Sequence, residues 1–176
     1  MTEVRSSYKS NLTYGDLLEA LIFSHEPKKI IEFGILDGYS LKYFAESGAQ
    51  VQAYDIFDEF IGNGPPPNIR EKFEKYENVK IDYGDFYQKW RDIEKCDIIH
   101  IDIANNGHVY QTAVERYLPL LNKGGFLILE GGSEKRDKVE WMEKYQKPLI
   151  HPYLESLDKS KWKVIGDFPS LTIIQN

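Results

Sequence analysis

An acidic turn with two glycines, placed after an apolar run, is the part of this sequence best suited to bind a ligand. Glu32 belongs to the apolar run, Gly34 and Gly38 stand four residues apart, and Ser40 follows two residues later. A second apolar run ends at Asp55. This order is typical of a first β-α-β unit, in which the strand ends bind a nucleotide-like ligand at one edge of a sheet.

The same turn indicates the charge of that ligand. A dinucleotide-binding turn has the pattern Gly-x-Gly-x-x-Gly, which lets a helix N-terminus meet a pyrophosphate. Leu36 stands where the second glycine of that pattern belongs, and the Glu32 carboxylate would repel a pyrophosphate. A cationic ligand without phosphate is therefore favoured, and S-adenosylmethionine is such a ligand.

The spacing from residue 30 to residue 129 resembles that of the class I S-adenosylmethionine-dependent methyltransferases that act on small molecules. The resemblance implies that the turn passes the methionine part of the cofactor and that Asp55 accepts hydrogen bonds from both ribose hydroxyls. It also implies that Phe86 lies against the adenine ring. The implied cofactor-binding residues are Glu32, Phe33, Gly34, Asp37, Gly38, Ser40, Asp55, Ile56, Gly84, Asp85, Phe86 and Asp102. The product would be S-adenosylhomocysteine.

Two of these acids also have simpler explanations. Asp55 could form a turn or cap a helix, and Asp85 could cap the helix that starts at Phe86. The joint order of the acids and glycines at successive strand ends favours the cofactor.

Catalysis depends on fewer residues. Methyl transfer needs the acceptor and the methyl group held in line, and it needs a base only when the acceptor arrives protonated. The resemblance places Asp102 nearest the methyl group, as the expected catalytic residue. Asn105 occupies the position of the histidine that many relatives carry. His108 and His151 are weaker candidates, and His100 is expected to be a buried core histidine.

A magnesium site is a less favoured alternative. Metal-dependent relatives place an acid after strand four and Asp-Asn after strand five. Here Asp102 matches the first, but strand five ends in Glu130 followed by two glycines. Asp102, Glu130 and Asn105 or Asn106 could offer oxygen ligands. Alternatively, Glu130 lines the acceptor pocket or caps a turn, and we assign no metal ligand.

Composition fits one domain spanning residues 1–176. The chain has 22 basic and 28 acidic residues and a net charge of -6, which disfavours a nucleic-acid partner. Its single cysteine, Cys96, fits a reducing cytoplasm and is expected to be a small buried hydrophobe. The sequence has no apolar run of membrane-spanning length and no signal-peptide core at its N-terminus, so we expect a cytoplasmic protein without a membrane partner.

Alternating helical and strand patterns predict a doubly wound, mostly parallel α/β sheet with helices on both faces and a C-terminal antiparallel hairpin. The predicted helices span residues 14–24, 40–47, 68–76, 86–91, 107–121 and 133–145. Thr13 and Asn68 are the expected caps of the first and third helices, and the segment 123–125 is expected to end the fifth. The predicted strands span residues 30–33, 51–55, 79–83, 97–102, 126–130, 162–166 and 170–174. The resemblance implies seven strands in the order 3-2-1-4-5-7-6.

Three segments are candidates for the pocket of a small-molecule acceptor. They are the N-terminal helix and lid 1–27 with Tyr8 and Tyr14, the proline-rich loop 62–68, and the segment 147–153. The alternating charges of the run 134–144 are typical of a helix with a solvated face. We expect its apolar residues to face the sheet or a partner such as a second copy. We expect methylation of oxygen or nitrogen.

Two other functions remain open from the sequence. An NAD(P)-linked oxidoreductase fits the general α/β order and Asp55, although Leu36 opposes it. A non-catalytic binding module on a methyltransferase scaffold fits the loss of the usual acceptor-side motif.

Overall fold

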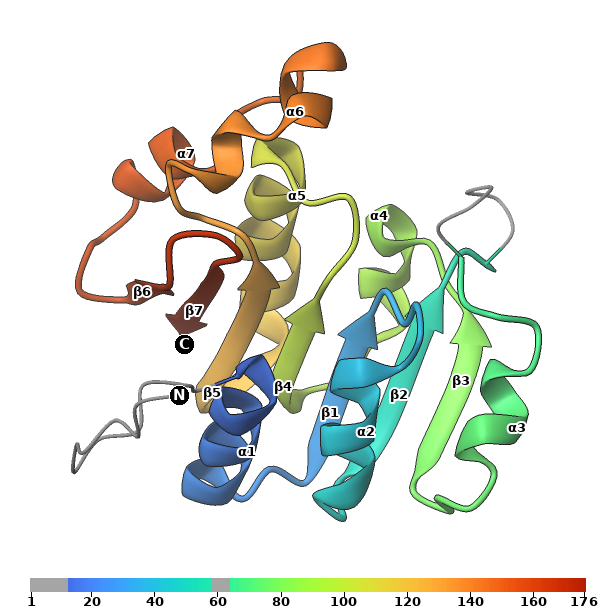
Figure 1. The fold of residues 1–176 in the computed structure, drawn as a ribbon. Coiled ribbons are helices and arrows are strands. Elements are labelled where there is room, and N and C mark those ends of the chain that lie inside the picture. The colour runs from blue at the N-terminus through green and yellow to red at the C-terminus, as the bar shows by residue number, and fades with distance from the viewer. Residues whose placement is uncertain (1–12, 58–63) are drawn as a thin grey trace, which may run out of the picture.

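Seven strands form one sheet in the order β3-β2-β1-β4-β5-β7-β6 in the computed structural model, which describes residues 13–57 and 64–176 (Figure 1). The strands are β1 (Lys29–Phe33), β2 (Gln50–Asp55), β3 (Val79–Tyr83), β4 (Cys96–Ile101), β5 (Leu121–Glu130), β6 (Trp162–Ile165) and β7 (Leu171–Gln175). The first five pair in parallel, and β7 pairs antiparallel with β5 and β6. The predicted order and the C-terminal hairpin are confirmed.

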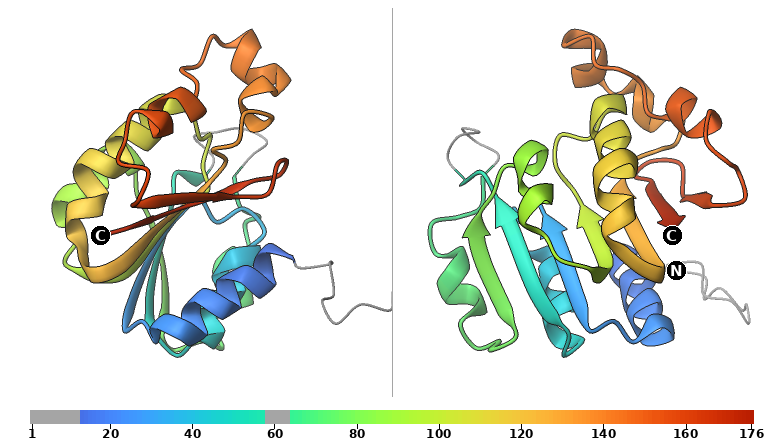
Figure 2. Two further views of the ribbon diagram at one scale, coloured as in Figure 1. Left: turned by 90° about the vertical axis from the view of Figure 1, so that its left-hand side faces the viewer. Right: turned by 180° about the vertical axis from the view of Figure 1, so that it is seen from behind.

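Helices cover both faces of this sheet (Figure 2). One face carries α1 (Tyr14–His25), α2 (Tyr39–Glu46) and α3 (Ile69–Phe73). The other face carries α4 (Phe86–Lys89), α5 (Gly107–Thr112) and α7 (His151–Glu155). A further helix, α6 (Glu140–Lys144), stands beyond the carboxyl ends of the strands (Figure 1).

The strands are apolar on both faces because both faces are covered. Ile30 and Ile98 pack on the side of α1 and α2, whereas Ile31 and Ile99 pack on the side of α5. Cys96 is buried at the start of β4, and burial raises its pKa to about 12, so it is a small core residue as predicted. At the start of α1, Thr13 and Asp16 form a reciprocal capping box, which confirms the predicted cap.

The long helix predicted for 107–121 is wrong in its second half. After α5 the chain continues as the π-helical turn η3 (Ala113–Tyr117) and the 3-10 turn η4 (Leu118–Leu120). The segment 123–125, expected to end that helix, lies inside β5, where the pairing with β4 shifts in register.

Two further helix predictions need correction. Asn68 makes no side-chain capping bond, and α3 ends at Phe73. The charged helix expected at 133–145 is divided into the 3-10 turn η5 (Arg136–Lys138) and α6, because Val139 is extended. A short 3-10 turn, η2 (Trp90–Asp92), follows α4. Among the described helices, none combines the length and the apolar character needed to cross a membrane.

Candidate functional site

The turn after β1 and the end of β2 meet at the carboxyl edge of the sheet. Asp55 is buried there, and its Oδ2 accepts a hydrogen bond from the backbone N–H of Ile35 at 2.8 Å. Its Oδ1 accepts one from the N–H of Phe57, also at 2.8 Å. Each carboxylate oxygen has a second lone pair. Asp55 therefore stabilises the turn, which is the simpler role considered for it from the sequence. Its oxygens can still accept further hydrogen bonds.

Glu32 lies below this turn and is 0% exposed. Its Oε1 accepts a hydrogen bond from the Ser40 hydroxyl at 2.5 Å and lies 3.1 Å from His100 Nδ1. Its Oε2 is buried without a hydrogen-bond partner among the described residues. His100 is thus a satisfied core histidine, as predicted. The Ser40 hydroxyl, which the resemblance assigns to the cofactor, donates to Glu32.

The two glycines of the turn have positive φ angles, 87° at Gly34 and 76° at Gly38, a conformation that favours glycine. A Cβ atom at Gly34 would lie 1.9 Å from the backbone oxygen of Asp102, because the ends of β1 and β4 approach each other closely. A Cβ atom at Gly38 would lie 2.5 Å from the Phe73 ring. A side chain at position 38 would therefore meet a ring of α3, and the approach of this turn to the cofactor stays a prediction.

The ring of Phe86 lies in the core, and its contact with adenine stays a prediction. Phe86 is 4% exposed and stacks on Tyr117, with 4.9 Å between the ring centroids. This ring belongs to the core between the sheet and η3. Asp85 caps α4, because its Oδ1 accepts a hydrogen bond from the N–H of Tyr87 at 2.9 Å.

Other implied cofactor residues divide between core and edge. The ring of Phe33 is buried and stacks on Tyr54 at 5.3 Å, so its contact is with the core. A Cβ atom at Gly84 would lie 2.6 Å from the same tyrosine. Asp37 is exposed and Ile56 is half-buried at the edge.

Asp102 directly follows β4, and its side chain is exposed. Its backbone N–H donates to the carbonyl oxygen of Phe33 at 2.8 Å, which fixes its position beside the turn. Burial raises the pKa of Glu130 at the end of β5, and the negative charge of Asp102 raises it further. Two neighbouring acids at adjacent strand ends can orient an acceptor or take its proton.

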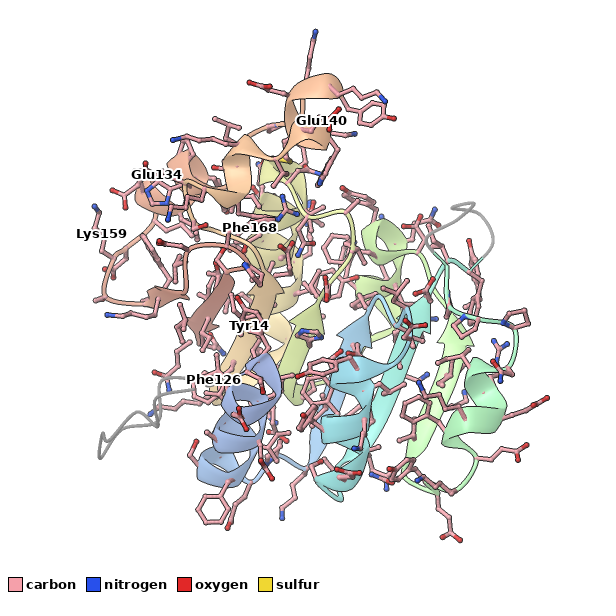
Figure 3. All side chains as sticks on the ribbon, in the orientation of Figure 1. Tyr14, Phe126, Glu134, Glu140, Lys159 and Phe168 are labelled. Atoms are coloured by element: carbon pink, nitrogen blue, oxygen red, sulfur yellow. The ribbon has the colours of Figure 1, made fainter. Side chains whose placement is uncertain are left out.

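Arg136 is a site residue that the sequence did not reveal. It lies in the run expected to be solvated, yet it is 6% exposed. Its Nε donates to Glu130 Oε1 at 2.6 Å, and its Nη2 donates to Glu130 Oε2 at 2.8 Å. Figure 3 shows Glu134 and Glu140, on either side of Arg136 in the chain, beyond the carboxyl ends of β4 and β5. The two glycines after Glu130 were the available signal, because they let the chain turn back toward that acid.

Asp137 is buried as well, which also corrects the prediction of a solvated run. Its carboxylate accepts hydrogen bonds from the N–H groups of Ile150 and His151, each at 2.8 Å. The Nδ1 of His151 lies 3.1 Å from the carbonyl oxygen of Gly132. Asp137 therefore holds the segment that leads into α7 against η5.

The donor set considered for magnesium does not fit that ion. Both oxygens of Glu130 accept hydrogen bonds from the guanidinium of Arg136, whose positive charge would repel a cation. The Oδ1 of Asn106 accepts the N–H of His108 and caps α5, while Asn105 Nδ2 donates to the carbonyl oxygen of Glu130. Within residues 13–57 and 64–176, no three His, Cys, Asp or Glu side chains are grouped to hold a metal ion.

The segments expected to form an acceptor pocket lie partly at this edge. The N–H of Gly107 donates to the carbonyl oxygen of Pro148 at 2.7 Å, so the segment 147–153 is docked on the start of α5. Burial raises the pKa of Tyr14, and the negative charge of Glu130 raises it further. The start of α1 therefore interacts electrostatically with the end of β5. Tyr8 and residues 62 and 63 of the proline-rich loop lie outside the described residues.

A surface hollow of about 640 Å³ lies elsewhere, at the amino edge of the sheet. Phe23, Lys28 and Gly48 are among its lining residues. It does not contain the acids of the strand ends, so it is not the candidate site.

Solved structures with the same arrangement are known. The SAH-bound Podospora anserina methyltransferase PaMTH1 is 19% identical over 93% of this chain and 78% of that chain, with a TM-score of 0.68. An O-methyltransferase from Bacillus cereus in complex with SAH is 16% identical over 97% and 83%, also at 0.68. The SAH complex of the N-methyltransferase NodS from Bradyrhizobium japonicum is 13% identical over 93% and 85%, at 0.66. The protein has the class I methyltransferase fold.

Sequence comparison adds no narrower assignment, since no protein-family model and no curated protein matches this chain. Structural neighbours with the class I methyltransferase fold include both O- and N-methyltransferases. The fold alone therefore leaves the acceptor atom open.

Proposed function

We propose that this protein is an S-adenosylmethionine-dependent methyltransferase that transfers a methyl group to oxygen or nitrogen of a small-molecule acceptor. The observation that supports this most is the hydrogen bond between Asp55 Oδ2 and the Ile35 N–H. It joins the acid of β2 to the turn of β1, the two elements that the class I methyltransferase fold uses for its cofactor. Three structural neighbours are SAH complexes of methyltransferases with this fold.

The charge of the site also supports a cationic cofactor. Glu32, Asp37, Asp55 and Asp102 all lie at or below the carboxyl edge, and Asp37 and Asp102 are exposed. Within the described part of the chain, no donor reaches the buried Glu32 Oε2. The ammonium of S-adenosylmethionine is a donor of the right charge, whereas the phosphates of NAD(P) would be repelled. This argument disfavours the oxidoreductase alternative.

The residues of the chain would have distinct roles. When bound, the cofactor supplies the activated methyl group. Asp55 would accept hydrogen bonds from the ribose hydroxyls, and the turn Gly34–Gly38 would line the methionine part. Asp102 would orient the acceptor or accept its proton, because it is the exposed acid at the end of β4. Glu130, held by Arg136, would line the acceptor side.

Calorimetric titration with SAH and with NADH tests the cofactor. We expect SAH to bind with a dissociation constant in the micromolar range, on the order of -8 kcal/mol, and NADH to give no heat of binding. Binding of NADH instead of SAH would support the oxidoreductase alternative. Conversion of S-adenosylmethionine to SAH with an acceptor then separates an enzyme from a binding module on the same fold.

A further inference from the structure

A cluster of side chains around one guanidinium lies at the carboxyl ends of β4 and β5. We call it the Arg136 cluster, and its members are Arg136, Asn105, Glu130 and Trp141. The guanidinium of Arg136 binds Glu130 side-on through Nε and Nη2, at 2.6 and 2.8 Å. Its Nη2 also reaches the backbone oxygen of Asn105 at 3.5 Å. The Trp141 ring covers the guanidinium, with 5.2 Å between the ring centroid and Cζ. The cluster therefore provides acceptors for Nε and Nη2 of the guanidinium, but it provides none for Nη1 among the described residues.

Two buried polar atoms of this cluster have no partner among the described residues. They are Arg136 Nη1, which donates, and Asn105 Oδ1, which accepts. Only four such side-chain atoms occur in residues 13–57 and 64–176, so two of them fall in one small cluster. Buried polar groups are nearly always hydrogen-bonded in native proteins. Among the described residues, Arg136 Nη1 thus lacks an acceptor and Asn105 Oδ1 lacks a donor, and a ligand group that both accepts and donates would supply them.

The charges around the cluster decide what kind of ligand fits. The guanidinium is already neutralised by Glu130, and Asp102 adds a second carboxylate at the neighbouring strand end, because Ile101 of β4 pairs with Leu129 of β5. A carboxylate or phosphate on the ligand would be repelled by both acids. A hydroxyl group is neutral, accepts from Nη1 and donates to an amide oxygen.

We propose that the acceptor of the methyl transfer is a neutral, hydroxyl-bearing small molecule, and that Arg136 and Asn105 bind one of its hydroxyl groups. This inference rests on the proposed function and adds the chemical class of the acceptor. Binding requires Trp141 to move off the guanidinium. Trp141 belongs to α6, which stands apart from the sheet (Figures 1 and 2), so such a movement leaves the strands in place.

Matched pairs of acceptors test this assignment through release of SAH from S-adenosylmethionine. The pairs are catechol with protocatechuate, methyl glucoside with glucose 6-phosphate, and glycerol with glycerate, which differ mainly in an anionic group. We expect at least one neutral member to be methylated, with kcat/KM at least about tenfold above its anionic partner. Preference for the anionic members, or methylation of no neutral member, would overturn the inference. Absence of SAH binding would instead overturn the proposed function.

Arg136→Lys tests the residue itself, because lysine keeps a positive charge for Glu130 but removes Nη1. We expect kcat/KM for the neutral probe to fall at least about tenfold, mainly through KM, with the SAH dissociation constant unchanged within about twofold. Arg116→Lys, at an exposed position of η3, is the matched control and should change neither value. Unchanged kinetics in Arg136→Lys would contradict the assignment.

A second pair of variants covers the case in which Arg136→Lys does not fold. Trp141→Ala should lower the KM of the neutral probe at least about threefold without changing SAH binding, because it removes the ring that must move off the guanidinium. Trp90→Ala, in η2 directly after α4, should leave that KM unchanged. Equal KM values in wild type and Trp141→Ala would refute the placement of the acceptor.

Discussion

Asp55 accepts the backbone N–H of Ile35 at 2.8 Å, so the acid at the end of β2 fixes the turn that follows β1. This single contact joins two sequence motifs that are 20 residues apart. It also orients the Asp55 carboxylate, and the remaining lone pairs of its oxygens stay available for a ligand at the carboxyl edge of the sheet. The first prediction tests that double role.

Asp55→Asn should weaken SAH binding by about 1–3 kcal/mol, because an amide cannot accept hydrogen bonds at both of its ends. The free energy of unfolding should also decrease, since the N–H of Ile35 or of Phe57 loses its acceptor. Calorimetry and urea unfolding measure the two effects. Asp158→Asn, in the loop before β6, is the control for binding. Equal SAH affinity in Asp55→Asn and wild type would show that the ribose does not contact this acid.

The second prediction separates two reasons for glycine at position 38. Gly38 and Gly48 have nearly the same φ, 76° and 77°, but only Gly38 has a ring 2.5 Å from its hypothetical Cβ. Gly48→Ala should therefore cost about 1–2 kcal/mol of unfolding free energy from backbone strain alone. Gly38→Ala should cost about 1–3 kcal/mol more, from the clash with Phe73. Equal losses in urea unfolding would leave Phe73 without a role in selecting glycine.

The ion pair of Glu130 and Arg136 leads to a third prediction. Arg136→Met or Glu130→Gln alone leaves one partner buried without the other, and should destabilise the fold by about 3–5 kcal/mol. The double variant should lose less than the sum of the two single losses, because no charge is left unpaired. A double-mutant cycle from chemical unfolding measures this coupling. Strictly additive losses would mean that the pair contributes nothing beyond its separate residues.

Asp102 should matter for turnover and little for cofactor affinity. Asp102→Ala should reduce methyl transfer by about 10²–10⁴-fold and change SAH binding by less than about 1 kcal/mol, because the partner of Asp102 is the acceptor. Asp92→Ala, at an exposed position of η2, is the control. Normal turnover in Asp102→Ala would leave positioning alone as the source of catalysis.

EDTA treatment accompanies that experiment. We expect no effect on the rate, since the guanidinium of Arg136 holds both oxygens of Glu130. Loss of activity that magnesium restores would show that Asp102 belongs to a metal site.

Much of the fold could be predicted because its signals are local. Apolar runs that end in an acid or a glycine mark the strands and their carboxyl ends, and Asp55 and Asp102 lie where those runs place them. Parallel pairing and helices on both faces follow from buried strands joined by helices. The exact strand order came from the resemblance.

The missed features depend on partners that are distant in the sequence or absent from local patterns. Phe86 is part of the core because Tyr117 stacks on it, 31 residues later. Arg136 is buried because Glu130 accepts its guanidinium, whereas the alternating charges around it are typical of a solvated helix. Gly38 faces Phe73 because α3 folds back over the turn, and no local pattern shows that contact.

A crystal structure of the protein with SAH tests the central claim most directly. The measurement is the distance from the ribose hydroxyl oxygens to the Asp55 carboxylate oxygens. We predict SAH across the carboxyl edge, with its methionine part along the turn Gly34–Gly38 and ribose-to-Asp55 distances of about 2.5–3.0 Å. SAH bound elsewhere, such as in the hollow beside Phe23, or a ribose that does not contact Asp55, would contradict the account.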